Sequence, residues 1–139
     1  MFGKILVAND GAPGDRKALE AAVELSKRIS APLHMVMVGE LALFPATIDE
    51  VQEEKDEADH RFAPIIKAAQ AYARSRDVMI DTHVVPGQVA EAAVGLVREQ
   101  GFDLLVVGFI GHSQLYERII GGTTDRLVRL APCTVLVVK

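Results

Sequence analysis

Hydrophobic residues along the chain form short continuous runs that alternate with segments of helical periodicity. Five runs predict strands, and four of them are near-continuous and aliphatic: Lys4–Ala8 (KILVA), Leu33–Val38 (LHMVMV), Asp103–Val107 (DLLVV) and Val135–Val138. The fifth, Val78–Val85, is interrupted by polar residues. Between the five runs, apolar residues recur at spacings typical of one helix face. This pattern predicts four helices, at Asp15–Ile29, about Thr47–Arg76, Gln88–Gln100 and Gly121–Leu130.

The order of these segments is β-α-β-α-β-α-β-α-β. It predicts an α/β fold, a single doubly wound five-stranded parallel sheet sandwiched by four helices, with residues 1–139 as one Rossmann-like domain. In such sheets ligands bind beyond the carboxyl ends of the strands, where the strand order reverses. The candidate site is therefore the set of strand-end loops: Asn9–Gly14, Gly39–Phe44, Pro86–Gln88 and Gly108–Thr124.

The second predicted helix changes character at Pro64. Asp49–Arg61 is almost wholly charged, whereas the IIKAAQAYA segment after Pro64 is apolar. Because proline interrupts the helical hydrogen-bond ladder, we expect a kink or a break there. The acidic segment is typical of a solvated helix face, and the alternative, a lid over the site, stays open at this point.

Charge and cysteine content exclude several classes of function. The formal net charge is -4, so no basic excess is available for binding nucleic acid. The sole cysteine, Cys133, permits no internal disulfide, which favours a cytoplasmic location. The N-terminal apolar run is too short for a signal peptide or a membrane span. The histidines are scattered, with none spaced as a ligand pair, so we predict no protein metal site.

Four glycines within the stretch from Gly108 to Gly122 raise the question of a phosphate site. Gly108 and Gly111 follow a strand, and Gly121 and Gly122 precede a helix. Their amides, the positive end of the helix dipole and the Thr123 and Thr124 hydroxyls match the needs of an anion. The lysine of a Walker loop and the GxGxxG fingerprint are both absent. From the glycines alone, a tight strand-to-helix joint is the favoured interpretation, because glycine also serves wherever the backbone needs a positive φ.

The segments around these glycines help to decide between a phosphate site and a structural joint. GFIGHSQLYERIIGG has the spacing G-x2-G-x9-G and is followed by LAPCTVLVV, and the chain begins with KILVANDG. Together these segments resemble the universal stress protein family, over essentially the whole chain. The resemblance implies a five-stranded parallel sheet that holds ATP across the strand ends, with any Mg²⁺ carried by the phosphates. It also implies a homodimer formed by pairing of Val135–Val138 with its copy.

Carried over residue by residue, the resemblance assigns roles to nine positions. Asp10 would lie beside the nucleotide, although Asn-Asp-Gly is also ordinary turn chemistry. Val38 would pack near adenine. The loop that tracks ribose and phosphates would contain Val107, Gly108 and Gly111, and the phosphates would meet Gly121, Gly122, Thr123 and Thr124.

Two positions depart from the family's nucleotide-binding pattern. Gly122 stands where those members have Ser or Thr, and Phe109-Ile110 stands where many carry a polar or basic residue. One lost hydrogen bond to a charged phosphate is worth about 1.5–3 kcal/mol, so we expect roughly tenfold to hundredfold weaker binding rather than none.

Three hypotheses about function follow. The first is a regulatory stress-response module that binds ATP or a related adenine nucleotide. Its turnover would be little or none, since no general base can be argued at the loops. The alternative is a dimeric interaction or signalling member whose glycines only shape the loop. The third is a nucleotide hydrolase or adenylyl-transfer enzyme, which rests on the similarity of the sheet alone.

Overall fold

The structure is a computed structural model, and it describes residues 2–39, 48–109 and 122–139. Strands and helices alternate along these residues. In chain order they are β1 (Ile5–Ala8), α1 (Pro13–Ile29), β2 (Leu33–Gly39), α2 (Ile48–Ser75), β3 (Ile80–Pro86), α3 (Val89–Gln100), β4 (Leu104–Gly108), α5 (Thr123–Leu130) and β5 (Thr134–Val138). Their boundaries lie within a residue or two of the predicted ones, so the predicted alternation is confirmed.

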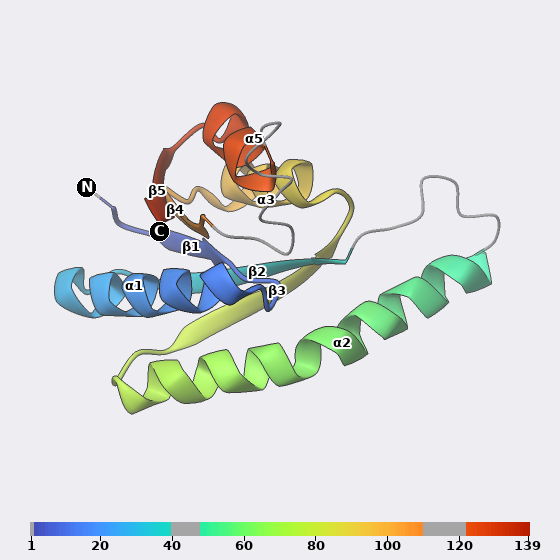
Figure 1. Cartoon of the computed structure of the whole chain (residues 1–139), viewed down its shortest axis with the longest axis horizontal. Coiled ribbons are helices and arrows are strands. Elements are labelled where there is room, and N and C mark those ends of the chain that lie inside the picture. The colour runs from blue at the N-terminus through green and yellow to red at the C-terminus, as the bar shows by residue number, and fades with distance from the viewer. Residues whose placement is uncertain (1, 40–47, 110–121) are drawn as a thin grey trace.

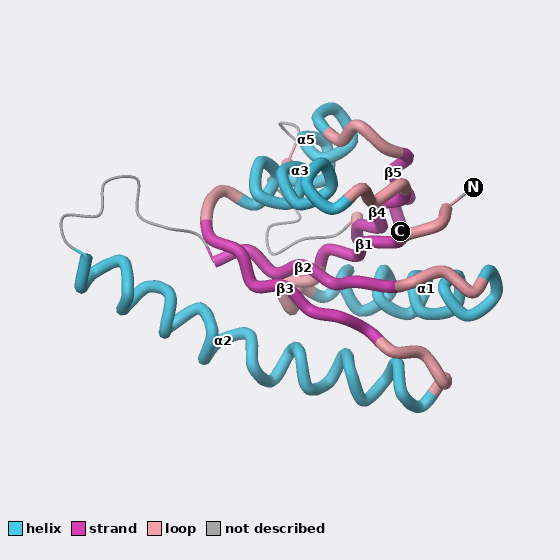
Figure 2. Tube along the Cα trace, turned by 180° about the vertical axis from the view of Figure 1, so that it is seen from behind, coloured by secondary structure: helices cyan, strands magenta, loops and turns pink. Residues whose placement is uncertain are grey.

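The five strands form one parallel sheet in the order β3-β2-β1-β4-β5. Helices α1 and α2 cover one face of this sheet, and α3 and α5 cover the other (Figures 1 and 2). This is the doubly wound arrangement that the sequence predicts. Because β1 is at the centre, the chain turns to one side after β1 and returns to the other side of it at β4.

The sheet separates two hydrophobic clusters. Successive side chains of a strand point to opposite faces. In β1, Ile5 and Val7 join the cluster under α1 and α2, whereas Leu6 joins the cluster under α3 and α5. All three are fully buried. The continuous apolar runs of the sequence therefore reflect strands that are covered on both faces.

Helix α2 continues through Pro64, so the expectation of a break there is wrong (Figure 1). A proline inside a helix costs about 3 kcal/mol, chiefly through a lost hydrogen bond and a steric clash. The helix survives because its apolar half is held against the sheet, where Phe62, Ala69 and Ala73 are buried. In the preceding acidic segment, the charged side chains that are described are exposed, as a solvated helix face requires.

Strand β5 lies at an edge of the sheet and is less buried than β1. It pairs with β4, and its Leu136 side chain is 40% exposed. Within the described ranges, no helix is both long and apolar enough to cross a lipid bilayer.

Candidate functional site

The strand order places the candidate site at the carboxyl ends of β1 and β4. These neighbouring strands are followed by elements that leave toward opposite faces, α1 on one and α5 on the other (Figure 2). Diverging connections of this kind open a crevice at the edge of the sheet. Asp10 follows β1, Gly108 ends β4, and Gly122 directly precedes α5. The topology thus brings together loops that are far apart in the sequence.

The loop after β1 is held by two consecutive side-chain turns. The Gly11 amide donates to Asn9 Oδ1 at 3.0 Å, and the Ala12 amide donates to Asp10 Oδ1 at 3.0 Å. Gly11 adopts a φ of +89°, a conformation that favours glycine. The turn interpretation of Asp10 is therefore confirmed. It also fixes the Asp10 carboxyl group at the strand end.

Asp15, in the first turn of α1, completes an acidic pair that sequence reasoning missed. Its Oδ2 accepts a hydrogen bond from the Asp10 amide at 2.9 Å. Burial, together with a side-chain hydrogen bond to Asp10, raises the pKa of Asp15 to about 8. At neutral pH this carboxyl group therefore holds its proton, and the pair presents less negative charge to the crevice than two carboxylates would.

Gly108 lies so close to the start of α1 that no side chain fits. A Cβ atom there would stand 2.7 Å from the Gly14 carbonyl oxygen and 3.0 Å from Asp15 Oδ1. The Gly14 oxygen belongs to the backbone and the Asp15 side chain is partly buried, so neither atom can move far enough to make room for a Cβ. The glycine is thus required by the close approach of β4 to α1, a structural need that is independent of any ligand.

Helix α5 begins on the other side of the same glycine. Thr124 Oγ1 donates to the Gly108 carbonyl oxygen at 2.8 Å, which ties the first turn of α5 to the end of β4. The N-cap residues of α1 and α5 are Ala12 and Gly122, and neither makes a side-chain cap hydrogen bond. Two helix N-termini, each with a positive dipole end, therefore converge beside Gly108.

The remaining described members of the predicted set differ in exposure. Val38 and Val107 are 6% and 2% exposed and belong to one cluster on the α3/α5 face. Thr123 is exposed at the first position of α5. Gly111 and Gly121 lie outside the described residues, as does Ile110.

The Lys139 ammonium group lies next to the apolar residue Phe109, a contact that the sequence does not indicate. Phe109 is 46% exposed, and its amide donates to the Val138 carbonyl oxygen at 3.0 Å. Lys139 Nζ lies 5.2 Å from the centroid of the Phe109 ring, a cation–π distance. The parallel register of Gly108 with Val138 places these residues side by side. The register of β4 with β5 is therefore the information that identifies Lys139 as a neighbour of Phe109.

The histidines are not all scattered, which corrects the prediction. His34 on β2 and His83 on β3 face each other, with His34 Nδ1 2.8 Å from His83 Nε2. They are far apart in the sequence, so a search at helical spacing misses them. No group of three or more His, Cys, Asp or Glu side chains suited to a metal ion occurs among the described residues. Cys133 is half-buried, and burial raises the pKa of its thiol.

Comparison with known proteins shows which protein family the chain resembles. The family model of the universal stress protein family matches residues 1–139. The universal stress protein YxiE of Bacillus subtilis is 32% identical over 151 residues, covering 100% of both chains. Two solved structures are similar in fold. One is a universal stress protein in complex with cAMP, with a TM-score of 0.78, 23% identity and coverage of 100% and 99%. The other is the Archaeoglobus fulgidus universal stress protein in complex with dAMP, with a TM-score of 0.66, 17% identity and 100% coverage of both chains.

Proposed function

The chain belongs to the universal stress protein family, and on that premise we propose that it binds an adenine nucleotide and acts as a regulatory stress-response module. The site would be the crevice at the carboxyl ends of β1 and β4. One observation carries the proposal: the N-termini of α1 and α5, without side-chain caps, converge beside Gly108. Such amides and dipoles suit a phosphate group. The nucleotides in the two similar structures, cAMP and dAMP, agree with this chemistry.

The proposed roles follow the position of each residue. Val38, at the end of β2, would pack near the base, and Asp10, fixed by its turn, would face the ribose. Phosphate oxygens would meet the amides of Gly108 and Gly122 and the hydroxyl of Thr123. Val107, Gly111, Gly121 and Thr124 complete the proposed set. With ATP, Mg²⁺ would be carried by the phosphates and water.

Little or no turnover is proposed at this site. A general base needs hydrogen-bond reach to the attacking water. The Asp10 carboxyl group is already committed to the Ala12 amide and to Asp15. Phosphate release that is lost in an Asp10→Ala variant would contradict this and assign the protein to hydrolysis. We also propose that the protein resides in the cytoplasm.

The second candidate is a dimeric interaction module, and the edge strand β5 favours it. Leu136 on β5, and Val128 and Leu130 on α5, are large apolar residues that are 40%, 48% and 41% exposed. An open apolar edge is a place for another strand to pair. We propose a homodimer in which Val135–Val138 pairs with its copy. Dimerisation is compatible with nucleotide binding, so the second candidate becomes the sole function only if nucleotide fails to bind.

Thermal unfolding with added nucleotide tests the proposal. We expect AMP, cAMP or Mg-ATP to raise the melting temperature, since a ligand at 100 times its Kd adds about 2.7 kcal/mol to the free energy of unfolding. No change with any of them in the millimolar range would overturn nucleotide binding and leave the dimeric module.

The Gly122→Ser variant sharpens this test. A serine hydroxyl restores one hydrogen bond to phosphate, so we expect roughly tenfold to hundredfold tighter binding by calorimetry. Gly95→Ser on α3 is the matched control, since a Cβ at Gly95 meets nothing within 4 Å. Equal affinity in both variants would show that the phosphates do not reach Gly122.

A further inference from the structure

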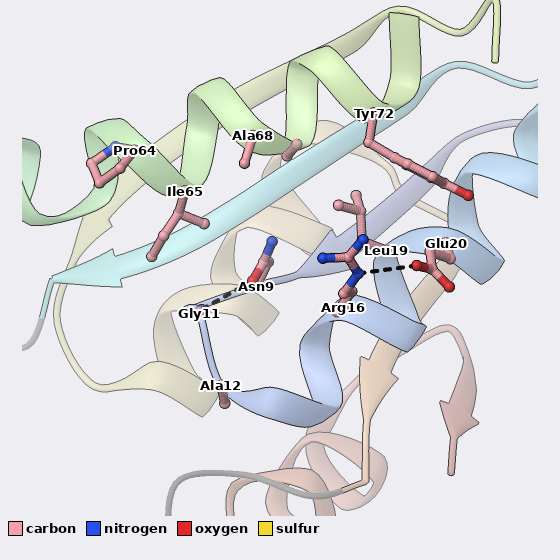
Figure 3. Close-up of a pocket in the computed structure, with 11 residues that line it drawn as sticks. Asn9, Gly11, Ala12, Arg16, Leu19, Glu20, Pro64, Ile65, Ala68 and Tyr72 are labelled. Atoms are coloured by element: carbon pink, nitrogen blue, oxygen red, sulfur yellow. Dashed lines mark hydrogen bonds and ion pairs between the residues drawn. The ribbon is translucent and has the colours of Figure 1, made fainter. Parts of the chain in front are cut away.

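A second cavity lies on the opposite face of the sheet from Val38 and Val107. It occupies the space between α1 and α2, above the loop that follows β1, and has a volume of about 380 Å³ (Figure 3). Small-molecule sites are commonly about 300–1,000 Å³ in volume. Its walls come from α1, from α2 near Pro64, and from Asn9 and Gly11. Its volume therefore falls within the range of small-ligand sites.

The walls of this α1–α2 cavity are mainly apolar. Leu19 of α1 and Ala69 of α2 are buried and form part of the lining, and Ile65 reaches over Gly11. Figure 3 shows Ile65 and Ala68 on α2 above the space and Leu19 on α1 beside it. An apolar body of a ligand would therefore leave water for an apolar surface, which is favourable.

Four side chains of the lining carry polar groups, Asn9, Arg16, Glu20 and Tyr72, and of these Asn9 is the buried one. Asn9 is 8% exposed, and its amide nitrogen points toward α2 in Figure 3. Its oxygen is engaged by the Gly11 amide. Among the described residues, the acceptor for the amide nitrogen is Met35 Sδ at 3.5 Å, and a thioether is a weak acceptor. The buried Asn9 amide nitrogen thus carries two hydrogens and has a weak acceptor in Met35 Sδ. It is therefore suited to donate a hydrogen bond to a ligand oxygen.

The charges of the lining indicate that this oxygen belongs to a neutral group. Arg16 and Glu20 line the mouth of the cavity and pair with each other at 3.2 Å. Both are exposed, so the pair leaves neither charge deep in the cavity. A charged ligand would lose its hydration without gaining an unpaired partner. A neutral ketone or amide carbonyl loses far less hydration free energy than a charged group when it enters the cavity.

We propose that the α1–α2 cavity binds a compact, uncharged and mainly apolar molecule with a carbonyl oxygen that accepts a hydrogen bond from Asn9 Nδ2. This site adjoins the strand-end crevice at Ala12, the N-cap of α1, but it does not rest on the proposed nucleotide function. The ligand's apolar body would lie against Leu19, Ile65 and Ala69. The Arg16–Glu20 pair would border its exposed side.

Cyclohexanone is the probe, and the Asn9 side-chain amide and Gly11 backbone amide signals in ¹H–¹⁵N NMR spectra are the readout. So small a ligand is expected to bind in roughly the millimolar range. We expect saturable shifts of both signals with cyclohexanone and at least about tenfold weaker binding of cyclohexanecarboxylate, because the cation among the described lining residues, Arg16, is paired with Glu20. Equal or tighter binding of the carboxylate would overturn the neutral-ligand assignment.

Two variants, Ala68→Phe and Asn9→Asp, and one control, Ala71→Phe, test whether the probe binds in the cavity. Ala68→Phe adds a ring at a residue that lines the cavity and should abolish the saturable shifts by occupying part of the space, whereas Ala71→Phe adds the same ring outside the lining; both alanines are exposed positions of α2. Asn9→Asp keeps the acceptor for the Gly11 amide but removes the donor, so we expect at least about tenfold weaker binding. Absence of saturation with the unmodified protein up to roughly 100 mM, far above that millimolar range, would overturn the proposal, as would equal shifts in Ala68→Phe.

Discussion

The strand-end crevice and the α1–α2 cavity share one loop but are built from different parts of the chain. Asn9 and Gly11 line the cavity, while Asp10 between them faces its partner Asp15 at the crevice. The crevice consists chiefly of backbone groups: two helix N-termini and a glycine. The cavity depends on side chains, among them Leu19 and Ile65. Backbone geometry survives most substitutions, so the crevice should tolerate changes in side chains that would close or reshape the cavity.

The largest loss of stability from a substitution is expected at Gly108, where the crevice depends on the absence of a side chain. Gly108→Ala forces a Cβ to within 2.7 Å of the Gly14 carbonyl oxygen, so we expect a loss of about 1–3 kcal/mol in the free energy of unfolding. Gly95→Ala is the control, since it lies inside α3 with open space around it. That change should stabilise the protein by up to about 1 kcal/mol. Urea denaturation measures both, and equal effects would refute the close packing.

Asp15 should make the stability of the crevice depend on pH. Its pKa is raised from 3.8 to about 8 in the folded protein, so the folded state holds a proton that the unfolded state has released. Stability should therefore fall as pH rises from about 4 to 8, by at most about 1.4 kcal/mol per pH unit for one proton. Asp15→Asn mimics the protonated form and should flatten this slope.

Thermal melts at several pH values between these limits provide the measurement. Glu99→Gln, at the exposed end of α3, removes a carboxylate elsewhere and should leave the slope as it is. A variant Asp15→Asn with the original slope would show that another group carries the pH dependence.

A smaller effect is expected at Thr124, where the crevice is joined to α5. Thr124→Val removes the hydrogen bond to the Gly108 carbonyl oxygen, and we expect a loss of about 0.5–1.5 kcal/mol in stability. Thr123→Val changes an exposed hydroxyl and should cost less stability. Thr124→Val should weaken the nucleotide response and spare the cyclohexanone shifts, whereas Ala68→Phe should do the reverse. If either variant impairs both ligands, the two sites are not independent.

The sequence predicts the architecture well because burial on both faces leaves near-continuous apolar runs in most strands, β3 excepted, and because helices have their own hydrophobic period. It leaves open whether Pro64 kinks or breaks the helix, and the break does not occur, because the packing of Phe62, Ala69 and Ala73 holds the helix against the sheet. Tertiary contacts outweigh the local preference there.

Within the candidate site, the sequence indicates the strand ends but not the pairings between them. Asp15, Lys139 and the His34–His83 pair emerge only when strand register and helix position are known. Gly108 was predicted as a phosphate-loop glycine, and its closeness to Gly14 gives it a packing role as well. Composition alone cannot distinguish these two reasons for a glycine.

The central position of β1 also has a consequence for how the molecule opens. Amides of β1 bond to strands on both sides, and its side chains are sealed under helices on both faces. Their hydrogen exchange should therefore require global unfolding, whereas amides of β5, at the half-exposed edge, should exchange through local fraying. Since the loop after β1 borders both the crevice and the cavity, both are anchored to the part of the sheet that opens last.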